Sequence, residues 1–238
     1  MKKTMVMLPT FNERENIKKL VPEILALDPN ISVLVVDDDS PDGTWRLVEE
    51  MAQREGRISL MHRTKNRGRG TAGIAGFLRA VESGADYIVE MDADYSHHPK
   101  YIPALVKQMD ENDVAIGSRL IEGGKEQGRN VVRTLITWFA NNYIRILMGV
   151  NIQDCTSGFR CFRRNVLESI RLEKMVSVGP SIVEEVLYAC VLKEFKIKEI
   201  PILFEERAHG ETTKTLGQYL DTAWKVIRFR LRMRKEGL

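Results

Sequence analysis

Residues 91–99, MDADYSHHP, gather two carboxylates and two imidazoles directly after the apolar run YIVEM. Asp92 and Asp94 are two residues apart, and in extended backbone such side chains point to the same side. A carboxylate pair suits Mg²⁺ or Mn²⁺, which keeps waters and takes its remaining ligands from substrate phosphates. An Asp-x-Asp pair is common by chance, but at the end of a buried strand it favours a metal site.

The histidines of the same stretch could supply a further metal ligand or a proton carrier. His97 and His98 are adjacent, and the backbone before Pro99 is extended, so their side chains cannot both point the same way. Polar residues in this setting more often form turns or cap helices. We therefore interpret Asp92 and Asp94 as metal ligands and both histidines as turn residues.

Similar polar stretches follow other apolar runs of the chain. They are PTFNERE (9–15), DDDSPDGT (37–44), NRGRGTAG (66–73) and SRLIEGG (118–124). In the second, Ser40 and Asp42 can cap a helix, which leaves Asp37 and Asp38 to hydrogen-bond a base or ribose. In the third, Arg67 and Arg69 resemble an anion cradle without the Gly-Lys-Ser/Thr of a P-loop.

The elements that position these residues alternate between strand and helix. Strands are expected at 4–9, 31–36, 58–62, 87–91 and 113–118, and helices at 13–27, 44–54, about 71–82 and from near Pro99. Near-continuous apolar strands separated by helices indicate a parallel sheet covered on both faces. The prediction is an α/β fold with an open, mostly parallel, doubly wound sheet, which binds ligands at the carboxyl ends of its strands.

The pattern changes after Arg119. VVRTLITWFANNYIRILMGV (131–150) is helical but apolar on more than one face, so it is either a buried helix or one lying against membrane or a lipid chain. A strand and turn at 155–164, a helix over 181–194, a strand at 196–206 and a basic C-terminal helix over 216–238 follow.

Composition sets limits on the class of protein. The chain has 238 residues, 43% hydrophobic and 29% charged, with a net charge of +3 that does not argue for nucleic acid. No apolar run approaches the roughly 18 residues needed to cross a bilayer. Three cysteines without metal-ligand spacing indicate core thiols in a reducing cytoplasm (Cys155, Cys161 and Cys190).

Five motifs in order resemble glycosyltransferase family 2. They are PTFNERENI, VVDDDSPDGT, MDADYSHHP, GSR and TSGFR, and they look most like the dolichyl- or polyprenyl-phosphate mannose synthases of that family. The resemblance covers about residues 4 to 220. It implies a GT-A fold, a nucleotide-sugar donor such as GDP-mannose, one divalent cation (Mg²⁺ or Mn²⁺), a polyprenyl-phosphate acceptor and inversion at the sugar carbon.

The resemblance also implies roles for individual residues. On the donor side, Pro9, Phe11 and Glu13 would hold base and ribose, and Asp38 would contact the base edge. Asp92 and Asp94 would bind the cation that bridges the donor diphosphate. On the acceptor side, the residues implied to grasp the lipid phosphate are Arg119, Arg133 and Arg207, with Thr137 nearby. Arginine suits this role because its planar fork matches phosphate oxygens.

Three departures from the subgroup concern residues 66–70, 207–214 and 178–185. NRGRG stands in place of Lys-Leu-Gly-Leu-Gly and is nearer to the polyprenyl-phosphate glucosyl relatives. In RAHGETTK the lysine, Lys214, lies one place later than usual. VGPSIVEE keeps Glu185 but lacks the usual aromatic and glutamine. The alternatives are a related transferase using UDP-glucose or another UDP-sugar, a non-lipid acceptor, a nucleotidyltransferase, or a binding module without turnover.

We expect one GT-A domain over residues 1–238. Residues 1–120 would form its nucleotide-sugar and metal half. Residues 121–238 would form the acceptor half, with amphipathic C-terminal helices that face a membrane. The predicted location is the cytoplasm, with peripheral attachment to the membrane helped by anionic lipid near Arg228, Arg230, Arg232 and Arg234.

Overall fold

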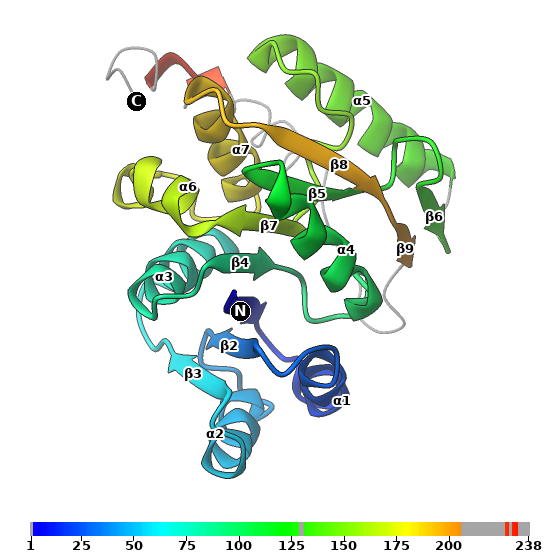
Figure 1. Cartoon of the computed structure of the whole chain (residues 1–238). Helices are drawn as coiled ribbons and strands as arrows, with labels where there is room; N and C mark the ends of the chain where they lie inside the picture. Colours follow the sequence, from blue (N-terminus) through cyan, green and yellow to red (C-terminus); the bar gives the residue numbers. More distant parts are fainter. Residues whose placement is uncertain (1, 129–130, 206–226, 229, 233–238) are drawn as a thin grey trace.

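The structure is a computed structural model that describes residues 2–128, 131–205, 227–228 and 230–232, without the side chain of Arg133 (Figure 1). Its main sheet has seven strands in the order β3-β2-β1-β4-β7-β5-β8. The strands are β1 (Thr4–Thr10), β2 (Ile31–Asp37), β3 (Ile58–His62), β4 (Tyr87–Glu90), β5 (Val114–Ser118), β7 (Arg160–Arg163) and β8 (Ile197–Pro201). All neighbours pair in parallel except β7, which is antiparallel to β4 and β5. The predicted mostly parallel sheet is therefore confirmed.

Helices cover both faces of this sheet, as a doubly wound fold requires (Figure 1). They are α1 (Arg14–Leu25), α2 (Thr44–Arg54), α3 (Arg69–Glu82), α4 (Ile102–Lys107), α5 (Val131–Met148), α6 (Arg164–Ser169) and α7 (Ile182–Leu192). Short 3₁₀ turns occupy Pro99–Tyr101, Gln108–Asp110 and Leu172–Lys174. One apolar core packs α1, α2 and α4 on one face, and a second packs α3, α5, α6 and α7 on the other.

The order of the strands reverses beside β1. From β1 the chain passes to β2 and β3 on one side, whereas β4 lies on the other side. Ligands of open α/β sheets bind at such a reversal, outside the carboxyl ends of the strands. The polar stretches after β1, β2 and β4 therefore meet at the edge of the sheet where the fold favours a ligand.

The last predicted strand was wrong in its extent. Residues 197–205 form two strands, because β8 joins the main sheet and β9 (Leu203–Glu205) pairs with β6 (Lys125–Gln127) in a separate two-stranded sheet. Of the predicted C-terminal helix, the described residues 227–228 and 230–232 are helical, and the rest lies outside the described part of the chain.

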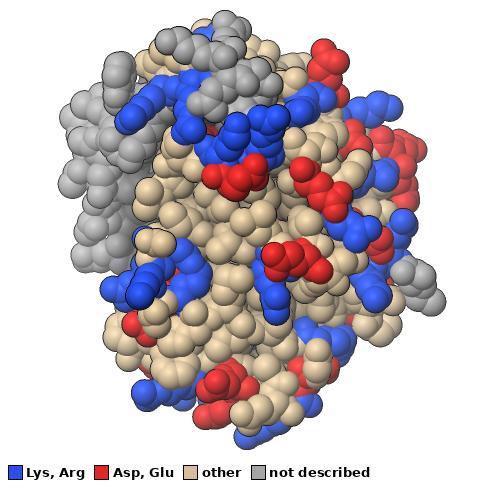
Figure 2. Space-filling model, turned by 90° about the vertical axis from the view of Figure 1, so that its left-hand side faces the viewer, with Lys and Arg blue, Asp and Glu red and all other residues tan. Residues whose placement is uncertain are grey.

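The core confirms the assignment of the cysteines. Cys155, Cys161 and Cys190 are buried and unpaired, and burial raises the pKa of each thiol above its ordinary value. Figure 2 shows that lysine, arginine, aspartate and glutamate side chains lie interspersed on one face of the molecule rather than in a patch of one sign. A mixed surface of this kind fits the small net charge.

Phenylalanines at buried and exposed positions allow a matched stability test. Phe162 is fully buried and meets Phe77 edge to face with ring centroids 5.5 Å apart, whereas Phe139 on α5 is exposed. We expect Phe162→Ala to lower the free energy of unfolding by about 3–5 kcal/mol, because it leaves a cavity in the core. Phe139→Ala should change it by less than about 0.5 kcal/mol. Urea denaturation followed by circular dichroism measures both, and equal effects would contradict the packing described.

Candidate functional site

The turn after β1 presents three of the residues expected to hold a nucleotide. Pro9 is buried in the last residues of β1, Phe11 is 56% exposed, and Glu13 precedes α1. The Glu13 backbone N–H donates to Thr44 Oγ1 at 3.1 Å, which ties this turn to the start of α2. The exposed ring of Phe11 lies in a turn that is tied to the start of α2, and a base could stack on it.

Asp37, one of two candidates to bind a base or ribose, has a structural role instead. It is completely buried, and its carboxylate accepts hydrogen bonds from Thr10 Oγ1, Ser40 Oγ and the Ser40 backbone N–H at 2.7, 2.7 and 2.9 Å. Ser40 therefore does not cap α2. Asp42 accepts from the Thr44 N–H at 2.9 Å, but the N-cap position of α2 is Gly43, so the predicted side-chain N-cap is not formed.

Asp38 lies at the same edge and is held by two donors. Its carboxylate accepts from Arg63 at 2.6 Å and from the Gly68 backbone N–H at 2.7 Å. The Gly70 N–H donates to the Val178 carbonyl at 2.7 Å. Two backbone N–H groups of the glycine-rich stretch 66–73 therefore bond to oxygens of the protein itself, and one of these oxygens belongs to a carboxylate.

The carboxylate pair follows β4 as predicted. Asp92 is partly exposed, and its carboxylate lies 3.3 Å from Arg69 Nη2 and 3.8 Å from His97 Nδ1. Asp94 is buried, and one of its oxygens accepts from the Ser96 N–H at 3.0 Å and from Ser96 Oγ at 2.5 Å.

Those two carboxylates fit a hard cation that is shared with a substrate. Within residues 2–128 and 131–205, no group of three or more His, Cys, Asp or Glu could hold a metal by itself. Mg²⁺ and Mn²⁺ do not need such a group, because one or two carboxylates suffice when phosphates and waters complete the shell. The donor set therefore matches a cation that arrives with a diphosphate.

His97 is not a turn residue, which corrects the sequence interpretation. It is buried, forms a β-bridge to Phe204, and stacks on Phe159 with ring centroids 5.1 Å apart. Burial lowers the pKa of His97 although carboxylates lie nearby, and its Nδ1 accepts from the Asp92 N–H at 3.4 Å. The neutral imidazole therefore holds the backbone of Asp92 in place through this contact. His98 caps as expected, since its Nδ1 accepts from the Lys100 N–H at 3.2 Å.

Arg69 is a site residue whose position sequence reasoning missed. It begins α3 and donates to Glu90 at 2.8 Å and to Asp92 at 3.3 Å. Burial alone would lower the pKa of Arg69, but Glu90 and Asp92 outweigh it and raise that pKa above its ordinary value. The sequence did contain a signal, since Glu90 is a charged residue inside an apolar strand. A buried charge is normally paired, so Glu90 predicts a nearby residue of opposite charge.

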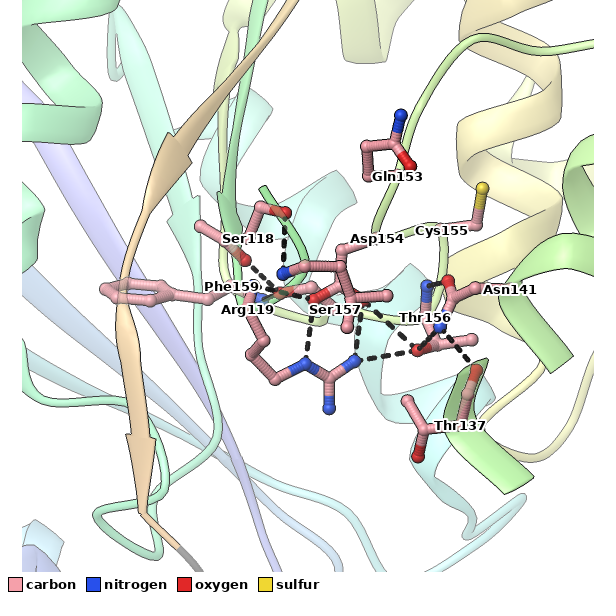
Figure 3. A network of polar contacts seen from close by, with 12 residues as sticks. Ser118, Arg119, Thr137, Asn141, Gln153, Asp154, Cys155, Thr156, Ser157 and Phe159 are labelled. Carbon is pink, nitrogen blue, oxygen red and sulfur yellow. Dashed lines mark hydrogen bonds and ion pairs between the residues drawn. The ribbon is translucent and has the colours of Figure 1, made fainter. Parts of the chain in front are cut away.

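Arg119 is the centre of a buried polar network after β5 (Figure 3). Its Nε and Nη2 donate to the two oxygens of Asp154 at 2.7 and 2.6 Å, and Nη2 also donates to Thr156 Oγ1 at 2.8 Å. Asn141 on α5 donates to Thr156 Oγ1 at 3.2 Å and to the Thr137 carbonyl at 2.9 Å. The network therefore ties the expected acceptor residues Arg119 and Thr137 to one another.

The other expected acceptor residues are less fully described. Arg133 lies in α5, four residues before Thr137, and its side chain is outside the described residues. Arg207 and Lys214 lie outside the described part of the chain altogether. Glu185 is buried and its carboxylate accepts from the Val176 and Ser177 backbone N–H groups, so it holds the loop before α7.

Helix α5 has a broad exposed apolar face. Ile144 and Met148 pack into the core. The exposed side chains are Val131, Val132, Leu135, Trp138, Phe139, Tyr143 and Ile146, of which Ile146 is 82% exposed. The interpretation as a wholly buried helix was therefore wrong. Among the described helices, none is both long and apolar enough to cross a bilayer.

Comparison with known proteins matches this chain to a family. Residues 5–171 match the family described as glycosyl transferase family 2. The chain is 38% identical over 98% of its length to a polyprenol monophosphomannose synthase of Mycolicibacterium smegmatis, covering 88% of that protein. It is 36% identical over 99% of its length to an undecaprenyl-phosphate mannosyltransferase of Micrococcus luteus, covering 97% of it. A dolichol-phosphate mannosyltransferase of Pyrococcus furiosus is 37% identical over 95% of this chain and 64% of its own length.

A solved structure resembles the fold. Glucosyl-3-phosphoglycerate synthase from Mycobacterium tuberculosis, in complex with Mn²⁺, uridine diphosphate and glucosyl-3-phosphoglycerate, superposes with a TM-score of 0.69. The match covers 97% of this chain and 79% of that one at 20% identity. The predicted GT-A architecture is therefore confirmed.

Asp154 provides a test of the network. Burial would raise the pKa of Asp154, but Arg119 outweighs burial and holds that pKa below its ordinary value. Asp154→Asn should lower the free energy of unfolding by about 3–5 kcal/mol at pH 7, because it removes the buried carboxylate that pairs with Arg119 through Nε and Nη2. The carboxylate stabilises the fold above the pKa of the unfolded state, about 4, and this contribution is lost as pH falls through the lower pKa of the folded state.

The difference between wild type and Asp154→Asn should therefore shrink as pH falls from 6 towards 3. Denaturant titrations across this pH range measure it. Asp39→Asn is the matched control, since the Asp39 side chain is only partly buried and pairs with His62 and Arg67. It should change stability by less than about 1 kcal/mol. A pH-independent effect of Asp154→Asn would refute the assigned ion pair.

Proposed function

The chain belongs to glycosyl transferase family 2, and from this premise we propose that it transfers mannose from GDP-mannose to a polyprenyl or dolichyl monophosphate, with inversion at the sugar carbon. It is a glycosyltransferase. One observation carries the choice of reaction: three relatives at 36–38% identity, matched over 95–99% of this chain, are named for mannose transfer to such lipids or for polyprenol monophosphomannose synthesis.

In this proposal the donor lies at the ends of β1, β2 and β4. Pro9, Phe11 and Glu13 hold the base and ribose, and Asp38 contacts the base edge. The exposure of the Phe11 ring and the burial of Asp38 at the same edge support this arrangement. A base would then stack on an apolar surface and hydrogen-bond to a carboxylate whose position is already fixed by Arg63 and Gly68.

Asp92 and Asp94 hold Mg²⁺ or Mn²⁺ in this proposal. When bound, the cation neutralises charge on the departing nucleoside diphosphate. The presence of Mn²⁺ with uridine diphosphate in a solved protein of the same fold supports a cation here. The neutral His97 keeps the backbone of Asp92 in place, and Ser96 fixes one oxygen of Asp94, so both carboxylates are oriented before any ligand arrives.

The acceptor phosphate is grasped by Arg119, Arg133 and Arg207, with Thr137 nearby. Asp154 holds Arg119 by Nε and Nη2, so Nη1 is the nitrogen that faces away from this ion pair (Figure 3). A phosphate monoester is largely ionised at neutral pH and attacks the sugar carbon without a strong general base. Residues 1–120 thus act as the donor and metal half of one domain, and residues 121–238 as its acceptor half.

The lipid tail needs an apolar surface beside that phosphate. The exposed apolar face of α5 supplies one, on the helix that also carries Thr137 and Arg133. We propose that this face lies in the cytoplasmic leaflet and that the protein is cytoplasmic with peripheral membrane contact. The basic C-terminal segment, of which Arg228, Arg230 and Arg232 are described, would add attraction to anionic lipid at about 1 kcal/mol per charge.

A transfer assay tests the function and the metal ligands together. Undecaprenyl phosphate would be incubated with Mn²⁺ and either GDP-mannose or UDP-glucose, and the glycolipid measured by mass spectrometry. We expect mannosyl transfer with the wild type. Asp94→Asn should abolish it and Asp92→Asn should reduce it at least about tenfold, because each removes charge from the cation site at constant size. Circular dichroism checks that both variants fold.

Exclusive use of UDP-glucose would instead assign a glucosyltransferase. Turnover that is unchanged in EDTA would refute the metal assignment. The matched control for the aspartates is Asp110→Asn, which removes an exposed carboxylate after α4 and should leave turnover within about twofold of wild type.

Flotation on vesicles tests the membrane proposal. The wild type should float with vesicles containing anionic lipid and be released by high salt, because part of its attraction is electrostatic. Phe139→Glu should lose flotation, since it places a charge on the apolar face of α5. Leu78→Glu, at an exposed leucine on α3, is the control and should float like wild type. Equal flotation of Phe139→Glu and wild type would exclude α5 as the membrane face.

A further inference from the structure

Arg69, the first residue of α3, lies between a buried glutamate and a proposed metal ligand. Its Nη2 donates to Glu90 Oε1 at 2.8 Å and to Asp92 Oδ1 at 3.3 Å. Glu90 is only 2% exposed at the end of β4, whereas the Asp92 side chain is 32% exposed. One nitrogen of the guanidinium therefore joins the interior of the sheet to a carboxylate of the metal pair at its edge.

Two glycines leave the space that this guanidinium occupies. A Cβ atom at Gly73, four residues after Arg69, would lie 3.3 Å from Nη1, which is tighter than most contacts of a Cβ atom. A Cβ atom at Gly158, shortly before β7, would lie 3.6 Å from Nη2. A side chain at residue 73 would therefore press on the guanidinium, and its absence leaves room for Arg69 to reach Asp92.

The charge of Arg69 is permanent and its anchor is fixed. Glu90 lies directly opposite Arg160 in the antiparallel ladder of β4 and β7, and Arg160 is 1% exposed. Although burial opposes its charge, Glu90 and Asp92 raise the pKa of Arg69 above its ordinary value. An arginine keeps its proton in proteins, so a positive charge stays beside Asp92 at every pH near neutrality.

The contact differs from the usual arrangement of a stabilising ion pair. Nη2 bridges both carboxylates, whereas Arg69 Nη1 is buried and has no hydrogen-bond partner among the residues that the structure describes. A paired arginine commonly donates from two nitrogens to one carboxylate, as Arg119 does to Asp154. A buried donor without a partner lowers stability, so the position of Arg69 calls for a reason other than stability.

That reason lies in the electrostatics of the metal site. A positive charge within hydrogen-bond reach of Asp92 opposes the binding of a divalent cation, because like charges repel strongly at a few ångströms in a partly buried site. The guanidinium also occupies an oxygen of Asp92 that a cation could use. A nucleoside diphosphate counters both effects, since it brings negative charge and further oxygen ligands.

We propose that Arg69 is a positioning residue that holds Asp92 when no cation is bound and makes cation binding depend on the diphosphate. The free protein then binds Mg²⁺ or Mn²⁺ weakly, and cation and nucleoside diphosphate strengthen each other's binding by the same factor. The inference rests on the proposed metal site and adds a residue outside the Asp-x-Asp pair that controls it. In turnover, the site releases its cation once the diphosphate has left.

Binding of Mn²⁺ to the full chain, measured by electron paramagnetic resonance with and without GDP or UDP, tests this inference. Without nucleotide, Arg69→Gln should bind Mn²⁺ about tenfold more tightly than wild type, because a like charge has been removed. With the diphosphate, the two proteins should differ by less than about threefold, since phosphate oxygens then supply ligands that Arg69 does not occupy. Arg69→Lys keeps the charge and should resemble wild type.

Glu90→Gln separates the effect of charge from structural damage. It removes a negative charge and leaves Asp92 as the charged partner of Arg69, so Mn²⁺ should bind more weakly than to wild type. Disruption of the Arg69–Glu90 pair as such would shift both variants in the same direction, whereas the proposal predicts opposite directions.

Arg79→Gln is the matched control for the loss of an arginine charge. Its side chain is 60% exposed on the same helix and pairs with Glu82, so Mn²⁺ affinity should stay unchanged. Circular dichroism checks the fold of each variant. Should Arg69→Gln fold poorly, Arg69→Met supplies the same test with an uncharged side chain of similar length.

The outcomes separate this inference from the proposed function. Mn²⁺ binding to a folded Arg69→Gln that is equal to or weaker than that of wild type would overturn the inference, with the metal site itself unaffected. Tighter binding to Arg69→Gln, in a protein whose wild type transfers no mannose, would uphold the inference and refute the proposed reaction. Failure of wild type and every variant to bind Mn²⁺ with either nucleotide would refute both the inference and the metal site.

Discussion

The ion pair between Arg119 and Asp154 is the interaction on which the second half of the site depends. It joins the end of β5 to the segment before β7, and through Thr156 and Asn141 it reaches α5. A guanidinium held on two edges cannot rotate, so its remaining nitrogen points in one direction. The helix that carries the apolar face is thereby fixed relative to the sheet that carries the carboxylates, as the proposed transfer between two ligands of different chemistry requires.

The first half of the site is organised by buried charge in a similar way. Arg69 spans Glu90 and Asp92, and Arg160, which is almost wholly buried, donates to the carbonyls of Cys155 and Val183. Burial lowers the pKa of Arg160, and Glu90 and Glu184 oppose this effect. Largely buried arginines therefore lie next to Asp92 as well as in the Arg119 network, so many of the polar contacts of this protein are made inside the fold rather than at its surface.

The sequence was sufficient for the parts of the fold that follow from periodicity. The strands and helices of the first 120 residues were located within a few residues, since apolar spacing reports which face is buried.

The sequence was insufficient where the partner of a residue is distant along the chain. Nothing near His97 reveals that Phe159 and Phe204 enclose it, and nothing near Asp37 reveals that Thr10 and Ser40 use up its carboxylate. The carboxylate pair after β4 was located because its two members are neighbours in the sequence. The Arg119 network was not, because its members come from three separate segments that only the fold brings together.

The antiparallel strand β7 has a consequence for how the chain is made. Strand β5 is joined to β1–β4 through β7, which lies between β4 and β5 in the sheet, although β7 is more than forty residues later in the sequence. A nascent chain emerging from the ribosome can assemble β1 to β4 early, but β5 must wait, with its apolar residues uncovered, until α5 and β7 have been synthesised. The order of synthesis thus places the apolar helix α5 outside the ribosome before the sheet closes, at the stage when a nearby bilayer or chaperone could receive it.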